Sequence, residues 1–394
     1  HSNYFFLNSK IAITSFASIS PLGNDSVAVW EAYQSEKSLI KPNPIGTSTV
    51  FASSLSEENK KRVASLRLTE SKYKFLDDSV LFAILASRQA VEIAGWDEEA
   101  VFGINIGSSR GATQLFEKHH AEFLSTGKAQ TLASPTTTLG NISSWVAQDL
   151  QNNGPEISHS ITCSTALHAL LNGIAWLRSG MADKFLVGGS EAPLTPFTIA
   201  QMQAMKIYTT AESADPYPCK TFNFDKTRNS MVLGEAAAVI CLENGVSEKA
   251  VAYVEGFGYA TENLTHSISI SAEATCFQKS MKMALGKMKS EEIDVVITHS
   301  PGTIQGDLSE MKAIEIVFAN HLPLLTNNKW KIGHTFGASG MLSVEMALLM
   351  LQHNQFIQVP FLKSQPQIRP LKKIMVNAVG FGGNAVSIVL SKNA

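Results

Sequence analysis

One layout occurs twice along the chain, and it limits the folds that the chain can adopt. The β-branched run Ile157–Thr162 predicts a buried strand, and the small residues of Ser164–Ser179 predict a helix directly after it. In the second half, Ile293–Thr298 again predicts a strand, and Ala338–His353 predicts a helix. Alternating strands and helices form layered α/β folds in which helices cover buried sheets. We therefore expect a pseudo-duplicated α/β fold.

The boundary between the halves is predicted near Leu242–Lys249, where Glu-Asn-Gly-Val-Ser interrupts two strand-like runs. We accordingly assign residues 1–245 to an N-terminal half and residues 246–394 to a C-terminal half. The chain has 394 residues, of which 44% are hydrophobic, so it is long enough for two packed domains or one large fused domain.

Charge and cysteine usage exclude several classes of function. The formal net charge of −2 gives no general attraction to nucleic acid or to an anionic membrane surface. The four cysteines have neither the spacing of a zinc site nor that of a disulfide framework, so we expect a reduced, cytoplasmic protein without a metal. The apolar run Met346–Leu351 is far too short to span a bilayer, and no membrane partner is expected.

Cys163 lies where the predicted strand gives way to the predicted helix. A thiol at a helix N-terminus lies near exposed backbone N–H groups and the positive end of the helix dipole, which favour the thiolate. Thiolate is the nucleophile in thioester exchange. A lone cysteine is also often buried and inert, and this segment alone leaves both interpretations open. Cys219, Cys241 and Cys276 lack this setting and are interpreted as structural.

Two histidines and a glycine-rich segment carry the other chemical signals. His299 follows the predicted strand Ile293–Thr298, and the carboxyl end of such a strand opens into a crevice. His334 lies where a loop leads into the second predicted helix, and each histidine taken singly fits a structural role at least as well. The segment Asn377–Asn384 places Phe381 among glycines, which allows either a tight turn with inward N–H groups or a simple hairpin.

In combination, these features resemble the β-ketoacyl-acyl-carrier-protein synthases of the elongating type. The chain has one cysteine before a small-residue helix, two histidines that head loops, Lys329 five residues before the second histidine, and a late Gly-Phe-Gly-Gly. The similarity begins at Ile13–Asn24, continues through Phe224–Glu235 and covers nearly the whole chain. It implies a thiolase-like fold, with two pseudo-duplicated βα halves in a five-layer α-β-α-β-α arrangement.

The resemblance implies a reaction. Cys163 matches the nucleophile that accepts the acyl group, and His299 and His334 match the two catalytic histidines. The implied chemistry is a decarboxylative Claisen condensation of the cysteine-bound acyl group with malonyl-acyl-carrier protein. The pathway would be fatty-acid or related polyene or polyketide elongation. A histidine rather than an asparagine as the second catalytic group favours elongation over initiation.

Supporting roles are implied in the same way. Lys329 matches the lysine that sustains the electrostatics of the site, and Asp307 and Glu310 match acidic residues of a supporting network. Phe381 matches the gating aromatic, whose backbone N–H shares an oxyanion hole with that of the cysteine. Thr303 matches one of two hydroxyl residues that bind the pantetheine arm; the other is replaced by proline in this chain.

The implied partner is an acyl carrier protein, whose phosphopantetheine arm brings the substrates, so no further cofactor is expected. A homodimer is expected, or a heterodimer with a chain-length partner. The alternative function is that of a non-catalytic chain-length partner of another ketosynthase, although such partners typically lack the cysteine.

Two predictions concern specificity. Arg110 occupies a position that commonly holds an apolar or very small residue bounding the acyl pocket, so we expect it to contact the substrate or to pair with protein groups nearby. A basic stretch with one acidic residue is predicted to dock the acidic carrier protein, the alternative being a solvated helix face. Its basic residues are Lys60, Lys61, Arg62, Arg67, Lys72 and Lys74.

Overall fold

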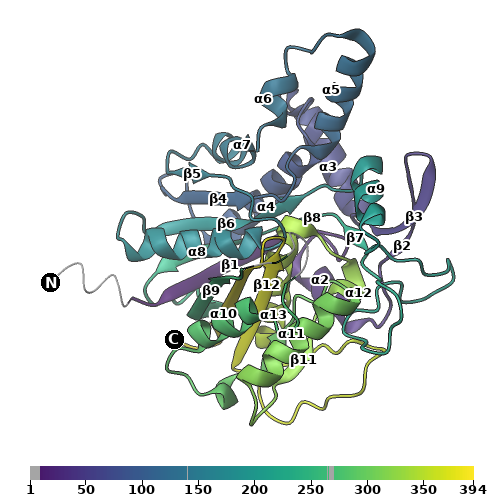
Figure 1. Cartoon of the computed structure of the whole chain (residues 1–394). Coiled ribbons are helices and arrows are strands. Elements are labelled where there is room, and N and C mark those ends of the chain that lie inside the picture. The colour runs from purple at the N-terminus through teal and green to yellow at the C-terminus, as the bar shows by residue number, and fades with distance from the viewer. Residues whose placement is uncertain (1–8, 140, 264, 266–269) are drawn as a thin grey trace.

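The computed structural model describes residues 9–394 except 140, 264 and 266–269, and most of its described strands belong to one large mixed sheet (Figure 1). This sheet has two halves of five strands each. The first half runs in the order β1 (Ile11–Ile19), β8 (Ala236–Asn244), β6 (Lys184–Glu191), β4 (Gly103–Gly107) and β5 (Glu156–Ile157). The second half runs in the order β9 (Ala252–Thr261), β13 (Asn384–Ser391), β12 (Lys373–Gly380), β10 (Val295–Ile297) and β11 (Leu324–Thr326).

The two halves repeat one topology. From β1 to β8 to β6 the neighbours are antiparallel, and β4 and β5 then continue in parallel. From β9 to β13 to β12 the neighbours are again antiparallel, and β10 and β11 continue in parallel. β1 and β9 join the halves through the pairing of Ile11–Ile13 with Ala252–Val254. The layout that recurs in the sequence therefore corresponds to a duplicated arrangement of strands.

Helices lie on both outer faces and between the two half-sheets. α4 (Asp78–Ala94) and α7 (Asn141–Leu150) pack on the first half, and α10 (Thr275–Leu285) packs on the second, with α11 (Ile304–Val317) against it. α8 (Thr165–Arg178) and α13 (Ser339–His353) pack together in the centre, where one apolar cluster joins them to both half-sheets. These are the five layers that the family resemblance implies.

Sequence and burial agree for the central helix. In α13, all residues from Ser339 to Leu351 are buried, because this helix has protein on every side. A helix that is apolar all round belongs in such a core, which explains the apolar run Met346–Leu351. Within the described part of the chain, no helix has the length and apolar character needed to cross a bilayer.

The predicted strand Ile157–Thr162 is wrong after its first residue, because β5 ends at Ile157. Beyond it, the Ser158 hydroxyl donates to the carbonyl of Ile106 at 2.8 Å, and the His159 carbonyl accepts from Ser108 N at 3.1 Å. Polar side chains and loop contacts thus replace the strand ladder. The chain then turns at Thr162, which has a φ of +45°.

The remaining described elements surround this core. A small sheet contains β2 (Lys41–Ile45), β3 (Ser48–Ser53) and β7 (Leu233–Gly234). The other helices and helical turns are α2 (Ser26–Gln34), α3 (Glu57–Thr69), η1 (Ser71–Tyr73), α5 (Thr113–Thr126), α6 (Ala133–Thr137), α9 (Pro196–Ala204), η2 (Ser290–Glu292), α12 (Lys329–Ile332) and η3 (Phe336–Ala338).

Candidate active site

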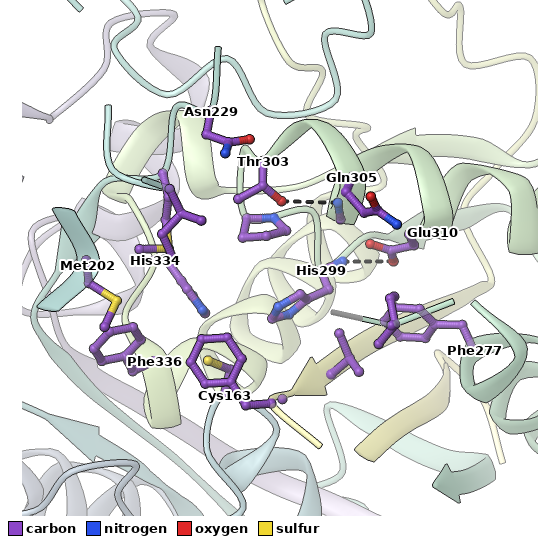
Figure 2. A pocket seen from close by; sticks show the side chains of 18 residues that line it. Cys163, Met202, Asn229, Phe277, His299, Thr303, Gln305, Glu310, His334 and Phe336 are labelled. Carbon is purple, nitrogen blue, oxygen red and sulfur yellow. Dashed lines mark hydrogen bonds between the residues drawn. The ribbon is translucent and has the colours of Figure 1, made fainter. Parts of the chain in front are cut away.

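A cavity of about 190 Å³ brings together residues from both halves of the chain. Cys163 enters it from the start of α8, His299 from the loop after β10, and His334 from the loop after α12. Figure 2 shows the two imidazole rings directed into the space beside Cys163. Three residues separated by up to 171 positions in the sequence (334 − 163) thus face one space.

Close backbone packing holds Cys163 against the end of β12. A Cβ added to Gly380 would lie 1.9 Å from Thr162 Oγ1 and 3.1 Å from the backbone nitrogen of Cys163, so only glycine fits there. The next residue, Phe381, also lines the cavity. The backbone segments of Cys163 and Phe381 are therefore neighbours, which suits an oxyanion hole made of two N–H groups.

Burial of Cys163 opposes the preference for a thiolate that a helix N-terminus gives. Cys163 is buried in an apolar cluster that includes Met202 and Phe336. Burial raises the pKa of the Cys163 thiol to about 12, Glu191 contributes to that rise, and Lys329 opposes it. The thiol therefore keeps its proton in the resting site and must lose it during attack.

His299 and His334 are neutral in this site. Their ring centroids lie 5.2 Å apart with an interplanar angle of 87°. Burial lowers the pKa of both imidazoles well below 6.5, and the positive charge of Lys329 lowers both further. Both Nδ1 atoms are buried without a hydrogen-bond partner among the described residues. Because an unpaired buried N–H group is costly, this arrangement favours the tautomer with the proton on Nε2.

Lys329 and Glu310 place a basic and an acidic group next to the histidines, and burial raises the pKa of the Glu310 carboxyl to about 7. The Lys329 side chain is fully buried, its Nζ has no hydrogen-bond partner among the described residues, and burial lowers its pKa to about 8. Glu310 accepts hydrogen bonds from the backbone N–H groups of His299 at 2.9 Å and Ser300 at 2.8 Å. Glu310 thereby fixes the loop that carries the first histidine.

Asp307 organises the adjacent wall of the cavity. Its carboxylate accepts hydrogen bonds from the backbone N–H groups of Phe222 at 2.9 Å and Gly302 at 3.0 Å, and from Lys226 Nζ at 2.7 Å. Thr303 follows directly, caps α11 by accepting from Gly306 N at 3.1 Å, and lines the cavity. The buried Asp307 therefore positions the loop to which Thr303 belongs.

Arg110 is not among the residues that line the cavity. Its guanidinium donates to the side-chain oxygen of Gln201 on α9, and the neighbouring Met202 does line the cavity. The guanidinium thus has a protein partner in this chain, which is one of the two roles expected for it.

The predicted docking residues separate into two groups. The half-buried arginines have internal partners: Arg62 donates to Asn59 Oδ1 at 3.3 Å, and Arg67 donates to the Asp78 carboxylate and to the Leu76 carbonyl. Arg67 therefore has a structural role that its sequence context did not predict. The exposed members of the set are Lys60, Lys61, Lys72 and Lys74.

Sequence reasoning missed several residues of this region, among them Glu191 beside the cavity and Met202, Phe336 and Asn229 in its lining. Glu191, fully buried at the end of β6, accepts hydrogen bonds from Ser109 N at 2.7 Å and Gly337 N at 3.0 Å. Its place at a strand's carboxyl end is the signal that singled out His299, and could have identified it. Phe336 and Asn229 also line the cavity, but nothing in their local sequence distinguishes them.

Comparison with protein families matches both halves of the chain. The model of the β-ketoacyl synthase N-terminal domain matches residues 8–247, and that of the C-terminal domain matches residues 251–360. The chain is 27% identical to 3-oxoacyl-[acyl-carrier-protein] synthase 2 of Coxiella burnetii, over 97% of this chain and 98% of that protein. It is 26% identical to the enzyme of the same name from Staphylococcus aureus, over 98% and 99% of the respective chains.

Solved structures share the fold. The ishigamide ketosynthase/chain length factor aligns with a TM-score of 0.85 at 20% identity, over 98% of this chain and 100% of that chain. A type II polyketide ketosynthase in complex with its acyl-carrier protein aligns with a TM-score of 0.84 at 19% identity, over 97% and 99%. The expected thiolase-like fold is confirmed, and the chain belongs to the β-ketoacyl synthase family.

Proposed function

We propose that this chain is an active elongating β-ketoacyl-acyl-carrier-protein synthase. The observation that carries the proposal is the convergence of Cys163, His299 and His334 on one cavity, with both imidazoles kept neutral by burial and by Lys329. Neutral imidazoles can donate hydrogen bonds from Nε2–H and can also accept a proton, whereas imidazolium can only donate. The site therefore suits a reaction that passes through an enolate and a thiolate.

The first half-reaction transfers an acyl group to Cys163. The thiol gives up its proton as Sγ attacks the thioester carbon, and a neighbouring neutral imidazole is suited to accept that proton. The backbone N–H groups of Cys163 and Phe381 stabilise the tetrahedral oxyanion. The bond from carbon to the pantetheine sulfur then breaks, and the departing sulfur takes the proton.

The second half-reaction forms the new carbon–carbon bond. A malonyl thioester loses carbon dioxide, and the electrons of the broken bond develop as charge on the thioester oxygen. The Nε2–H groups of His299 and His334 donate hydrogen bonds to this oxygen as the charge develops. The carbanion attacks the acyl-cysteine, the carbon–Sγ bond breaks, and the Cys163 thiolate regains a proton from water. The product is a 3-oxoacyl thioester two carbons longer.

The proposal includes the setting of the reaction. An acyl carrier protein is the partner, its phosphopantetheine arm carries both substrates, and the chain needs no resident cofactor. We place the enzyme in the reducing cytoplasm as a homodimer or a heterodimer; all four cysteines are free and buried, in keeping with a reducing compartment.

Intact-protein mass spectrometry and product analysis test the proposal. Incubation with acyl-carrier thioesters should add the acyl mass to the wild-type chain but not to Cys163→Ala, which should also form no 3-oxoacyl product. Cys241→Ala is the matched control, because this cysteine lies in β8 outside the cavity and should leave acylation in place. Acylation of Cys163→Ala, or condensation near the wild-type rate, would contradict the proposal.

The second candidate is a non-catalytic chain-length partner, in view of the fold shared with the ishigamide ketosynthase/chain length factor. The free Cys163 in a cavity with two histidines favours the active synthase. The two functions differ in one measurement. If the chain works only in complex with another ketosynthase and Cys163→Ala leaves the activity of that complex unchanged, the chain is the partner and not the catalyst.

A further inference from the structure

The inner end of the cavity is closed by two apolar side chains, Met202 and Phe336. Their exposed fractions are 3% and 4%, whereas Phe381 is 37% exposed and Gln305 is also exposed. Figure 2 shows Met202 and Phe336 side by side next to Cys163, with Gln305 farther away near the histidine loop. Because substrate enters from the solvent-exposed end, Met202 and Phe336 form the wall toward which an acyl chain on Cys163 extends.

Phe336 is held rigidly in a conformation that phenylalanine rarely adopts. Its φ is +46°, in the left-handed region, which is unfavourable for a residue with a side chain. The next residue, Gly337, donates to Glu191 at 3.0 Å, and a Cβ at that position would lie 2.5 Å from Ser109 N. These contacts hold the backbone that carries the ring in place. Strain of this kind persists where the resulting geometry serves a function.

The size of the cavity limits what can lie in front of this wall. Its volume is about 190 Å³. An apolar cavity of about 150 Å³ accepts benzene, a ring of six carbons. The same space must also admit the reacting end of the pantetheine arm, since His299, Thr303 and Gln305 line it as well. The room left for an acyl group is therefore that of a short chain.

We propose that Met202 and Phe336 restrict Cys163 to short acyl groups, of about six carbons or fewer. The inference rests on the proposed function and adds a substrate class to it. The enzyme then acts early in chain growth, so its substrate comes from a reaction that loads a short acyl group onto a carrier, and its product needs other enzymes for further growth.

Loading of Cys163 from small thioesters tests this directly. Acetyl, butyryl, hexanoyl and decanoyl pantetheine avoid any effect of carrier docking, and intact-protein mass spectrometry gives the loading rate of each. In the wild-type protein, the decanoyl rate should be lower than the butyryl rate by roughly tenfold or more. Phe336→Ala removes the ring, while the residue must still adopt the positive φ of this position. It should raise the ratio of decanoyl to butyryl loading by roughly tenfold.

Two further variants test whether the change in the loading ratio comes from the wall itself or from any enlargement of the cavity. Met202→Ala removes the other half of the wall without touching the strained turn, and should raise the same ratio even if Phe336→Ala fails to fold. Phe277→Ala removes an aromatic ring that lines the same cavity on the other side of Cys163, away from the wall (Figure 2), and should raise the ratio far less than the wall variants do.

The outcomes distinguish the two proposals. Equal loading of decanoyl and butyryl by the wild-type protein would overturn the length restriction and leave the condensing function intact. So would an unchanged ratio in Met202→Ala, or a rise in Phe277→Ala as large as that in the wall variants. Failure of every thioester, acetyl included, to load Cys163 would overturn the proposed function as well.

Discussion

The ion pair of Lys226 and Asp307 gives a quantitative test of how the active-site loop is held. The two side chains are 4% and 0% exposed, and their charged atoms lie 2.7 Å apart. Lys226→Met keeps the length and most of the volume of the side chain but leaves the Asp307 carboxylate buried without its counter-charge. Breaking a buried pair in this way costs about 3–5 kcal/mol of unfolding free energy.

Lys220→Met is the matched control, because its ion pair with Asp215 has a similar distance of 2.8 Å but side chains that are 33% and 23% exposed. An exposed pair of this kind contributes about 0–1 kcal/mol. Urea unfolding followed by circular dichroism, at one protein concentration for all variants, gives both values. Adding Asp307→Asn to Lys226→Met should recover part of the loss, since it removes the unpaired charge. Equal costs for Lys226→Met and Lys220→Met would refute the reasoning.

Three further predictions concern catalysis, docking and specificity. Both imidazoles should stay neutral below their ordinary pKa of 6.5, so the rate of malonyl decarboxylation by Cys163→Gln should stay level from about pH 7 to 6. Adding Lys329→Met removes a positive charge that lowers both histidine pKa values, so the fall of this rate at acid pH should begin at a higher pH. An acid limb at the ordinary histidine pKa, or one unmoved by Lys329→Met, would contradict this. Reversal of Lys72 and Lys74 to glutamate should raise KM for carrier-bound malonyl at low salt and spare pantetheine thioesters; equal losses would point to another surface. Arg110→Ala should leave the ratio of saturated to polar-ended acyl substrates unchanged, and a selective gain for saturated chains would show that the arginine selects substrate.

The two central helices could be predicted from their local sequence. The helix expected at Ser164–Ser179 is α8, at Thr165–Arg178, and the helix expected at Ala338–His353 is α13, at Ser339–His353. Their apolar content and small residues are enough to identify buried helices. The prediction of a strand through Thr162 was wrong because the Ser158 side chain makes hydrogen bonds where a strand would form backbone hydrogen bonds with its neighbour. Residue propensities do not reveal such contacts.

The sequence by itself predicted the duplicated alternation of strands and helices, because hydrophobic periodicity is a local property. The candidate catalytic residues came from the resemblance of the cysteine, the two histidines and the Gly-Phe-Gly-Gly segment, taken together, to the β-ketoacyl synthases. Only the tertiary structure decided their chemical state. The thiol of Cys163 is protonated and both histidines are neutral because burial removes water from these groups and Lys329 lies near them, through contacts between distant segments. The same holds for the wall of Met202 and Phe336: neither residue is unusual in sequence, and their role follows from the cavity that the folded chain encloses.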